Sequence, residues 1–177
     1  MKNEDNRAKY NEKKKMVNKP YISLGGFNKI TEEIRILRGK ADEVVQQIKD
    51  NRETETGDES ENVEMIRLMA ERESISEKFC ELEAFLSSCQ VVDIAALPEE
   101  SEVVRFGTKV RLLELDTEKQ FTYTILGERE SSVRDHIISH LSPLGRALMN
   151  EYVGNIVSFD TPNGERELEI LEISRHK

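Results

Sequence analysis

The residues best suited to chemistry lie in a polar, acidic stretch with no apolar side chain from Lys49 to Asn62. Two of its acids, Asp58 and Glu61, are three positions apart, so on a helical turn they would share one face. Carboxylates with ordinary pKa values are ionised near neutral pH. A pair of this kind could supply part of a site for a hard cation. On composition alone, a solvated tip kept charged for solubility is the favoured interpretation.

Long helical patterns flank the acidic stretch on both sides. Each has apolar residues at alternating steps of three and four, a heptad seam, and Ser23 is the predicted N-cap of the first. Arg72 interrupts the second seam and would set the register or face an acid. The short connection predicts an antiparallel coiled-coil hairpin over residues 21–97, although the seam could instead pair with a second copy of the chain. The seam residues are Phe27, Ile30, Ile34, Leu37, Ala41, Val44 and Ile48, then Met65, Leu68, Ile75, Phe79, Leu82, Leu86 and Cys89.

Length and composition limit the alternatives. The chain has 177 residues and a formal charge of -9, enough for one medium domain or two small ones. It has no apolar run of about 18 residues, so no membrane span is expected, and no apolar signal core. Residues 1–20 form a flexible, mildly basic arm, for which a solvated tail is favoured over contact with nucleic acid. Cys80 and Cys89 are predicted to be buried free thiols in a reducing cytoplasm.

The second half of the chain, residues 98–177, changes to a period of two. This pattern predicts a small antiparallel sheet with one short helix after Ser142 and Pro143, and hence an α+β fold. Asn163-Gly164 is a strong hairpin signal between the last two strands. The predicted strands are Val103–Phe106, Thr108–Leu115, Gln120–Leu126, His136–Leu141, Val153–Phe159 and Glu167–Ile173.

Two motifs make the chain resemble a known family over about residues 21–174. Gly57–Glu64 is similar to the tip pattern G-D-x-x-E-N-A-E-Y, and Ser142–Leu148 is similar to S-P-[IM]-A-R-[AG]-L, of the bacterial Gre-type transcript-cleavage factors, the GreA/GreB family. Supporting matches occur in the same order along the chain. They are Gln90–Asp93, Phe106-Gly107, Ile125–Gly127 and Thr161–Gly164.

The resemblance implies both a fold and a function. The fold is an N-terminal coiled-coil hairpin followed by an FKBP-like globular domain. The implied partner is bacterial RNA polymerase: the globular domain docks at the rim of the secondary channel, and the hairpin tip reaches the active site. There Asp58 and Glu61 would help hold the second Mg²⁺ ion and orient the water that cuts the 3′ end of backtracked nascent RNA. The chain would be a cofactor of the polymerase rather than an enzyme, and a cytoplasmic, DNA-binding monomer.

The chemistry of phosphodiester hydrolysis agrees with a metal site shared between this chain and the polymerase. Two-metal hydrolysis needs both ions about 3.5–4 Å apart, and a weakly held Mg²⁺ needs only one or two carboxylates because it keeps several waters. The two tip acids would therefore complete a site that the polymerase mostly supplies.

Departures from the family pattern leave an alternative open. The chain is two residues longer between Ile48 and Gly57, Met65 replaces Tyr, Gly145 replaces Ala, and the Arg-Pro pair is missing near Lys40. The alternative function is a non-catalytic binder of the secondary channel that inhibits or modulates the polymerase. A coiled-coil adaptor with no polymerase role is the third hypothesis.

Overall fold

The computed structural model describes residues 20–54, 62–99, 101–162 and 164–176. These residues form two compact units: a helical unit, Phe27–Ser88, and a globular unit made from the chain on either side of it. The boundaries between the two units lie after Gly26 and before Cys89. The sequence pattern instead predicts a hairpin domain that ends at residue 97. The reason is a parallel pairing that the sequence did not predict, between strand β1 (Tyr21–Ser23) and strand β2 (Gln90–Val92).

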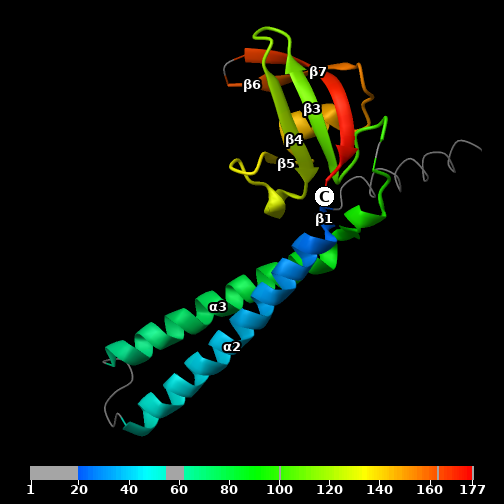
Figure 1. Cartoon of the computed structure of the whole chain (residues 1–177). Helices are drawn as coiled ribbons and strands as arrows, with labels where there is room; N and C mark the ends of the chain where they lie inside the picture. The colour runs from blue at the N-terminus through cyan, green and yellow to red at the C-terminus, as the bar shows by residue number, and fades with distance from the viewer. Residues whose placement is uncertain (1–19, 55–61, 100, 163, 177) are drawn as a thin grey trace, which may run out of the picture. The chain divides into compact units, whose positions relative to one another are not determined.

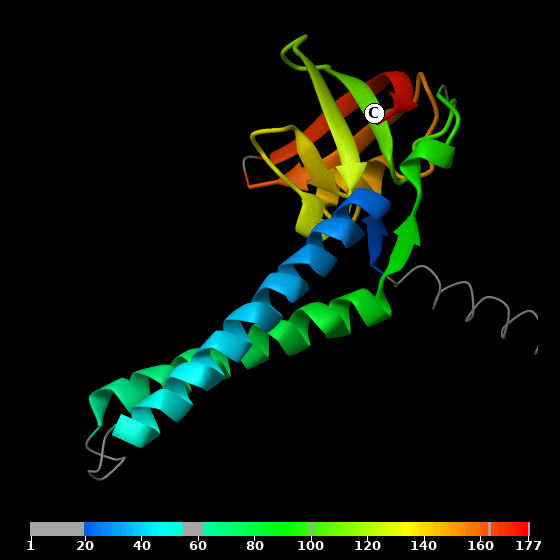
Figure 2. The ribbon, with the colours of Figure 1, turned by 60° about the horizontal axis from the view of Figure 1, so that its bottom comes forward.

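The helical unit is the predicted hairpin. Helices α2 (Leu24–Thr54) and α3 (Val63–Ser88) lie side by side in both views of the ribbon (Figures 1 and 2). The predicted N-cap is confirmed, because the Ser23 hydroxyl accepts a hydrogen bond from the Gly26 amide at 2.9 Å. Among the described residues, neither of these helices nor any other is long and apolar enough to cross a membrane.

The heptad seam is buried where the two helices pack. Val44 and Ile48 of α2 form a cluster with Met65 and Leu68 of α3. A seam that packs within one chain agrees with the intramolecular hairpin. The other buried seam residues are Ile30, Ile34, Leu37 and Leu82.

Charged residues also link the two helices, and Arg72, which interrupts the seam, is exposed. Lys78 pairs with Glu33 at 2.6 Å and Arg38 pairs with Glu83 at 3.2 Å. These pairs lie at the surface, so each contributes little to stability.

The prediction of buried cysteines is wrong. Cys80 is free and exposed, because it lies beside the seam position Phe79 and not on the seam. Cys89 is half-buried, just beyond the last residue of α3.

The globular unit contains a five-stranded sheet in the order β5-β4-β3-β7-β6. Pairings β3–β4, β3–β7 and β6–β7 are antiparallel as predicted, whereas β4 and β5 are parallel. The predicted hairpin between the last two strands is confirmed by the pairing of Thr161 with Gly164. The strands are β3 (Thr108–Glu114), β4 (Gln120–Leu126), β5 (Ile137–Ser139), β6 (Ile156–Thr161) and β7 (Gly164–Arg175).

The predicted strand at 103–106 is wrong. Val104 and Phe106 are buried, which explains the apolar pattern. However, Val104 exchanges hydrogen bonds with the backbone of Asn150 and Glu151 instead of with a strand of the sheet. Val103 makes an isolated bridge to Tyr152.

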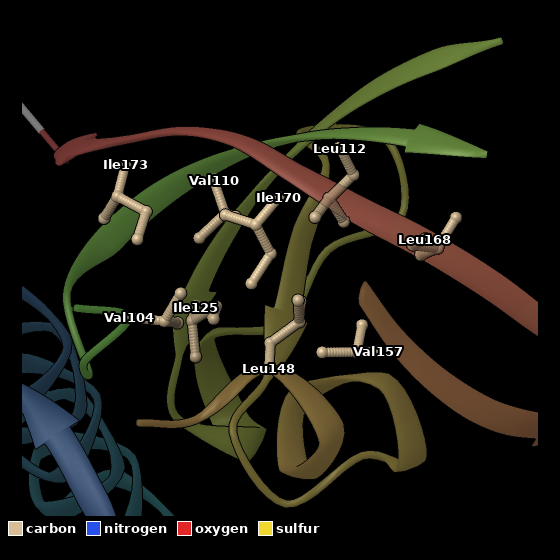
Figure 3. Packing of buried hydrophobic residues seen from close by; sticks show 9 residues of the cluster. All are labelled: Val104, Val110, Leu112, Ile125, Leu148, Val157, Leu168, Ile170 and Ile173. Atoms are coloured by element: carbon tan, nitrogen blue, oxygen red, sulfur yellow. The ribbon is translucent and has the colours of Figure 1, made fainter. Parts of the chain in front are cut away.

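One face of the sheet packs on helix α4 (Pro143–Leu148). In Figure 3 the side chains of Val110, Ile125 and Ile170 converge with Leu148, the fully buried residue of that helix. Helix α4 begins as predicted, because the Ser142 hydroxyl accepts a hydrogen bond from the Gly145 amide at 3.0 Å. Leu148 thus joins the helix to the sheet in one core.

The close approach of α4 to β5 accounts for one departure from the family pattern. A Cβ atom placed on Gly145 would lie 2.1 Å from the backbone oxygen of Ser139 and 2.9 Å from the Cα of His140. No side chain fits there without a shift of backbone. Glycine at this position is therefore required by the packing of this chain.

Two short 3-10 turns complete the globular unit, η1 (Ile94–Ala96) and η2 (Glu128–Glu130). Glu130 of η2 ties β1 to the sheet domain, because its carboxylate accepts hydrogen bonds from the Ser23 amide at 3.0 Å, the Gly127 amide at 3.2 Å and the Ser23 hydroxyl. The same serine hydroxyl caps α2, so these contacts fix the start of that helix.

Candidate functional site

The two predicted site residues, Asp58 and Glu61, lie outside the described residues, within 55–61. The structure does describe the two helix ends that flank them. Helix α2 ends at Thr54, and Asn62 precedes α3. These ends determine where the acidic stretch leaves the hairpin and where it returns.

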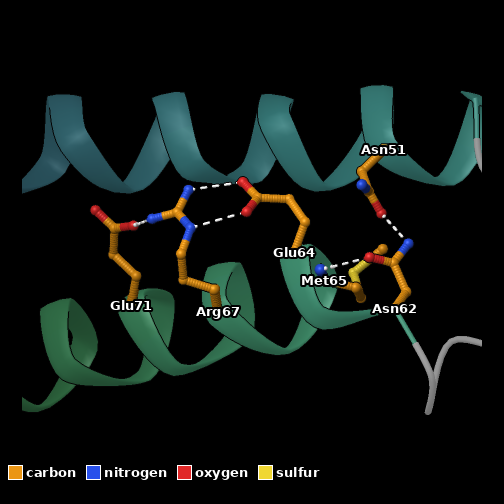
Figure 4. A network of polar contacts seen from close by, with 6 residues as sticks. All are labelled: Asn51, Asn62, Glu64, Met65, Arg67 and Glu71. Atoms are coloured by element: carbon orange, nitrogen blue, oxygen red, sulfur yellow. Dashed lines mark hydrogen bonds and ion pairs between the residues drawn. The ribbon is translucent and has the colours of Figure 1, made fainter.

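Asn62 joins the two helix ends with a single side chain (Figure 4). Its Oδ1 accepts a hydrogen bond from the Met65 amide at 2.9 Å, which makes it the N-cap of α3. Its Nδ2 donates to Oδ1 of Asn51, in the last turn of α2, at 2.8 Å. Both side chains are half-buried. The acidic stretch therefore starts and ends at helix ends that are held together.

The end of α2 has its own closing contact. The Thr54 hydroxyl donates to the carbonyl oxygens of Asp50 and Asn51, at 3.0 and 3.1 Å. The Asn51 carbonyl is among the last four of the helix, which have no amide partner within it. The hydroxyl thus satisfies a group that the helix end leaves open, and helical structure extends to the border of the acidic stretch.

Glu64, the last acid of the stretch, is already engaged within α3. Its two carboxylate oxygens accept from Arg67 at 2.8 and 3.0 Å, and Arg67 also reaches Glu71 at 2.9 Å (Figure 4). The Arg67 hydrogen bonds lower the pKa of Glu64. Glu64 is therefore ionised at neutral pH, in the first turn of α3 where a negative charge is favourable. Both carboxylate oxygens of Glu64 therefore face Arg67, in an ion pair that is exposed at the surface.

Met65, which replaces the family tyrosine, is a packing residue. Its side chain is fully buried against Val44, Ile48 and Leu68. The apolar seam of the hairpin thus continues to within three residues of Asn62. This departure from the pattern leaves a packed hairpin end rather than a gap.

Within the described ranges, no group of three or more His, Cys, Asp and Glu side chains is arranged to hold a metal ion. Asp58 and Glu61, the predicted metal ligands, lie outside those ranges. Their carboxylate oxygens are the kind of ligand that Mg²⁺ prefers.

In the globular unit, His140 is buried beside the rings of Tyr21 and Phe106, with ring centres 5.3 and 5.6 Å away. Its Nδ1 lies 3.1 Å from the carbonyl oxygen of Leu126, so Nδ1 carries the proton and donates it. Burial lowers the pKa of His140. The ring is a structural member of this aromatic cluster, which no local pattern in the sequence predicted.

A cavity of about 920 Å³ lies beside β7. It has both acidic and basic walls, Glu102 and Lys109 among them. Arg175, the other strong base there, donates to the carbonyl oxygens of Ala95 and Leu97 and pairs with Glu99. The walls of the cavity thus carry charges of both signs, and its arginine is engaged within the globular unit.

Models of two protein domains match this chain. Residues 20–91 match the N-terminal domain of transcription elongation factors, and residues 99–175 match the C-terminal domain of GreA/GreB transcription elongation factors. Together the two matches include both compact units and the acidic stretch.

Similar proteins carry the same description. The transcription elongation factor GreA of Yersinia pestis bv. Antiqua is 35% identical over 153 residues, covering 86% of this chain and 95% of that protein. The GreA of Helicobacter hepaticus is 42% identical over 117 residues, covering 66% and 71%.

Among solved structures, the GreA factor homolog 1 (Gfh1) of Thermus thermophilus is 22% identical, with a TM-score of 0.39 over 90% of this chain and 100% of that one. That superposition is loose, so the assignment rests on the two domain matches and on the sequence identity to GreA proteins. This chain belongs to the GreA/GreB family of transcription elongation factors.

Proposed function

We propose that this chain enters the secondary channel of bacterial RNA polymerase and stimulates the polymerase to cleave backtracked nascent RNA. The observation that supports this function best is the hairpin end. In a GreA/GreB family member, an acidic stretch is placed between two helix ends that Asn51 and Asn62 hold together. The chain acts as a cofactor, because two-metal hydrolysis also needs a second ion with its own ligands, which the polymerase supplies.

The proposed roles of the tip residues follow from their charge. Asp58 and Glu61 supply carboxylate oxygens to an Mg²⁺ ion shared with the polymerase. When bound, this ion would make a water molecule nucleophilic. Asn62 and Asn51 position the acidic stretch by joining the helix ends. Glu64 is paired with Arg67 through both of its carboxylate oxygens. The chain works where the polymerase works, in the cytoplasm.

The test uses a stalled, backtracked elongation complex and measures the release of short 3′ RNA fragments. Asp58→Asn and Glu61→Gln keep the size of each side chain and remove its charge. Each should slow cleavage at least tenfold at low Mg²⁺, because the shared ion loses an anionic ligand. Raising the Mg²⁺ concentration should restore part of the rate, because mass action refills a weakened site.

The matched control is Glu59→Gln, which removes one charge from the same stretch at a position off the face shared by Asp58 and Glu61. It should cleave within about twofold of the unaltered chain. Equal losses in all three variants would mean that only the total charge matters. A chain that never cleaves but slows elongation would establish the non-catalytic channel binder instead.

A further inference from the structure

Near the acidic stretch, helix α3 carries apolar side chains both in the seam and outside it. Met65 and Leu68 face α2 and are fully buried in the seam. Val63, Ile66 and Met69 lie outside the seam, with exposed fractions of 79%, 53% and 42%. We call these three residues the outer stripe. Their spacing of three places them along one side of the helix.

The outer stripe has sharp limits. Along the same side of α3, the small exposed residue Ala70 is followed by Glu73 and Glu77, both exposed acids. On one flank lies Arg67, whose guanidinium is bound to Glu64 and Glu71. A surface that fits the stripe is therefore apolar over about two helical turns and polar beyond them.

The stripe is presented on a well-defined helix end. Asn62 caps the first turn of α3, and Met65 anchors that turn in the seam. The apolar side chains therefore need little ordering on binding, which lowers the entropic cost of a contact.

The size of the stripe decides what can occupy it. Three partly exposed side chains offer about 300 Å² of apolar surface, at the lower end of patches that mark interaction sites. A stable dimer needs about 800 Å² from each partner, so the stripe alone cannot hold a second copy of this chain. A patch this small is effective as an additional contact with a partner already bound elsewhere, because the second contact is then intramolecular.

We infer that the outer stripe docks on an apolar surface of RNA polymerase along the path of the hairpin, beside the acidic stretch that ends just before it. This inference rests on the proposed function. It assigns binding energy to a described face of α3, separate from the carboxylates that would act on the metal. The stripe would fix how deeply, and in which rotation, the hairpin end comes to rest.

The test compares two isoleucines in the full chain. Ile66→Gln changes the stripe. Ile36→Gln is the control and changes an isoleucine of α2 with a similar exposed fraction, 47%. Ile36 belongs to no apolar stripe, because its neighbours one turn away are Glu32, Glu33, Gly39 and Lys40. The dissociation constant for purified RNA polymerase is measured for each by competition with the labelled unaltered chain.

Ile66→Gln should raise the dissociation constant at least fivefold, about 1 kcal/mol, and adding Met69→Gln should raise it further. Ile36→Gln should change it less than twofold. Unchanged circular dichroism melts would show that both variants fold, as expected for exposed positions. Equal affinities for all variants would overturn the inference while leaving the proposed function intact. An unaltered chain that does not bind polymerase would overturn both.

Sedimentation of the unaltered chain tests whether a second copy of the chain binds the outer stripe instead. A monomer at all concentrations supports the polymerase as the partner of the stripe. A dimer that Ile66→Gln dissociates would assign the stripe to a second copy and overturn the inference.

Discussion

The Asn62 side chain contributes to stability in two ways, as the cap of α3 and as a link to Asn51. Asn62→Ala removes the cap of α3, which typically costs about 0.5–2 kcal/mol. It also removes the hydrogen bond to Asn51, worth about 0.5–1.5 kcal/mol. Because both side chains are only half-buried, water can replace part of what is lost. We expect a total loss of about 1–3 kcal/mol in the free energy of unfolding.

Two companion variants divide this total. Asn62→Asp keeps an acceptor for the Met65 amide, places a negative charge at the N-terminus of α3, and lets the Asn51 amide turn and donate. It should change stability by less than about 0.5 kcal/mol. Asn51→Ala removes the link and leaves the cap, so it should cost only the smaller share, about 0.5–1.5 kcal/mol.

The measurement is urea unfolding followed by far-UV circular dichroism, which reports mainly on the long helices. If Asn62→Asp is destabilised as much as Asn62→Ala, capping is not the source of the loss. If the effects of Asn51→Ala and Asn62→Ala simply add in the double variant, the side chains are not coupled, and the argument that they join the helix ends is refuted.

Two further predictions concern the core of each unit. Leu82→Ala opens a cavity at a fully buried seam position and should cost about 2–5 kcal/mol in denaturant melts; a loss of a few tenths would mean that the seam closes around the gap. The pKa of His140 is lowered in the folded chain, so between its folded and unfolded values the unfolded chain binds more protons. Stability should therefore fall as the pH drops below about 6.5, and His140→Asn, which does not titrate, should lose this part of the pH dependence; an unchanged profile would exclude His140 as its source.

Periodic patterns were predictable from the sequence because they reflect local geometry. The seam from Ile30 to Ile48 and strand β3 follow their repeat directly. The cap at Ser23 and the start of α4 were predictable as well, because capping involves residues only three positions apart.

Contacts between distant segments were not predictable. Strand β1 has three residues and pairs with a segment beyond the whole helical unit. Val104 has the pattern of a strand because it is buried, but its hydrogen bonds go to residues 150 and 151. The link between Asn51 and Asn62 had no signal, although an asparagine just before a helix is a typical N-cap. The outer stripe was missed because its residues belong to no seam.

The parallel pairing of β1 with β2 makes the helical unit an insertion within the sequence of the globular unit. Until α2 and α3 pair, β1 is separated from its partner by a long unfolded loop, and each doubling of loop length adds about 0.6 kcal/mol to the cost of closure. Pairing of the two helices shortens that loop, so the order of folding favours the hairpin first. A substitution that unfolds α2 or α3 should therefore also free β1 from β2 and break the ring contact between Tyr21 and His140. This would happen although no residue of the five-stranded sheet is substituted.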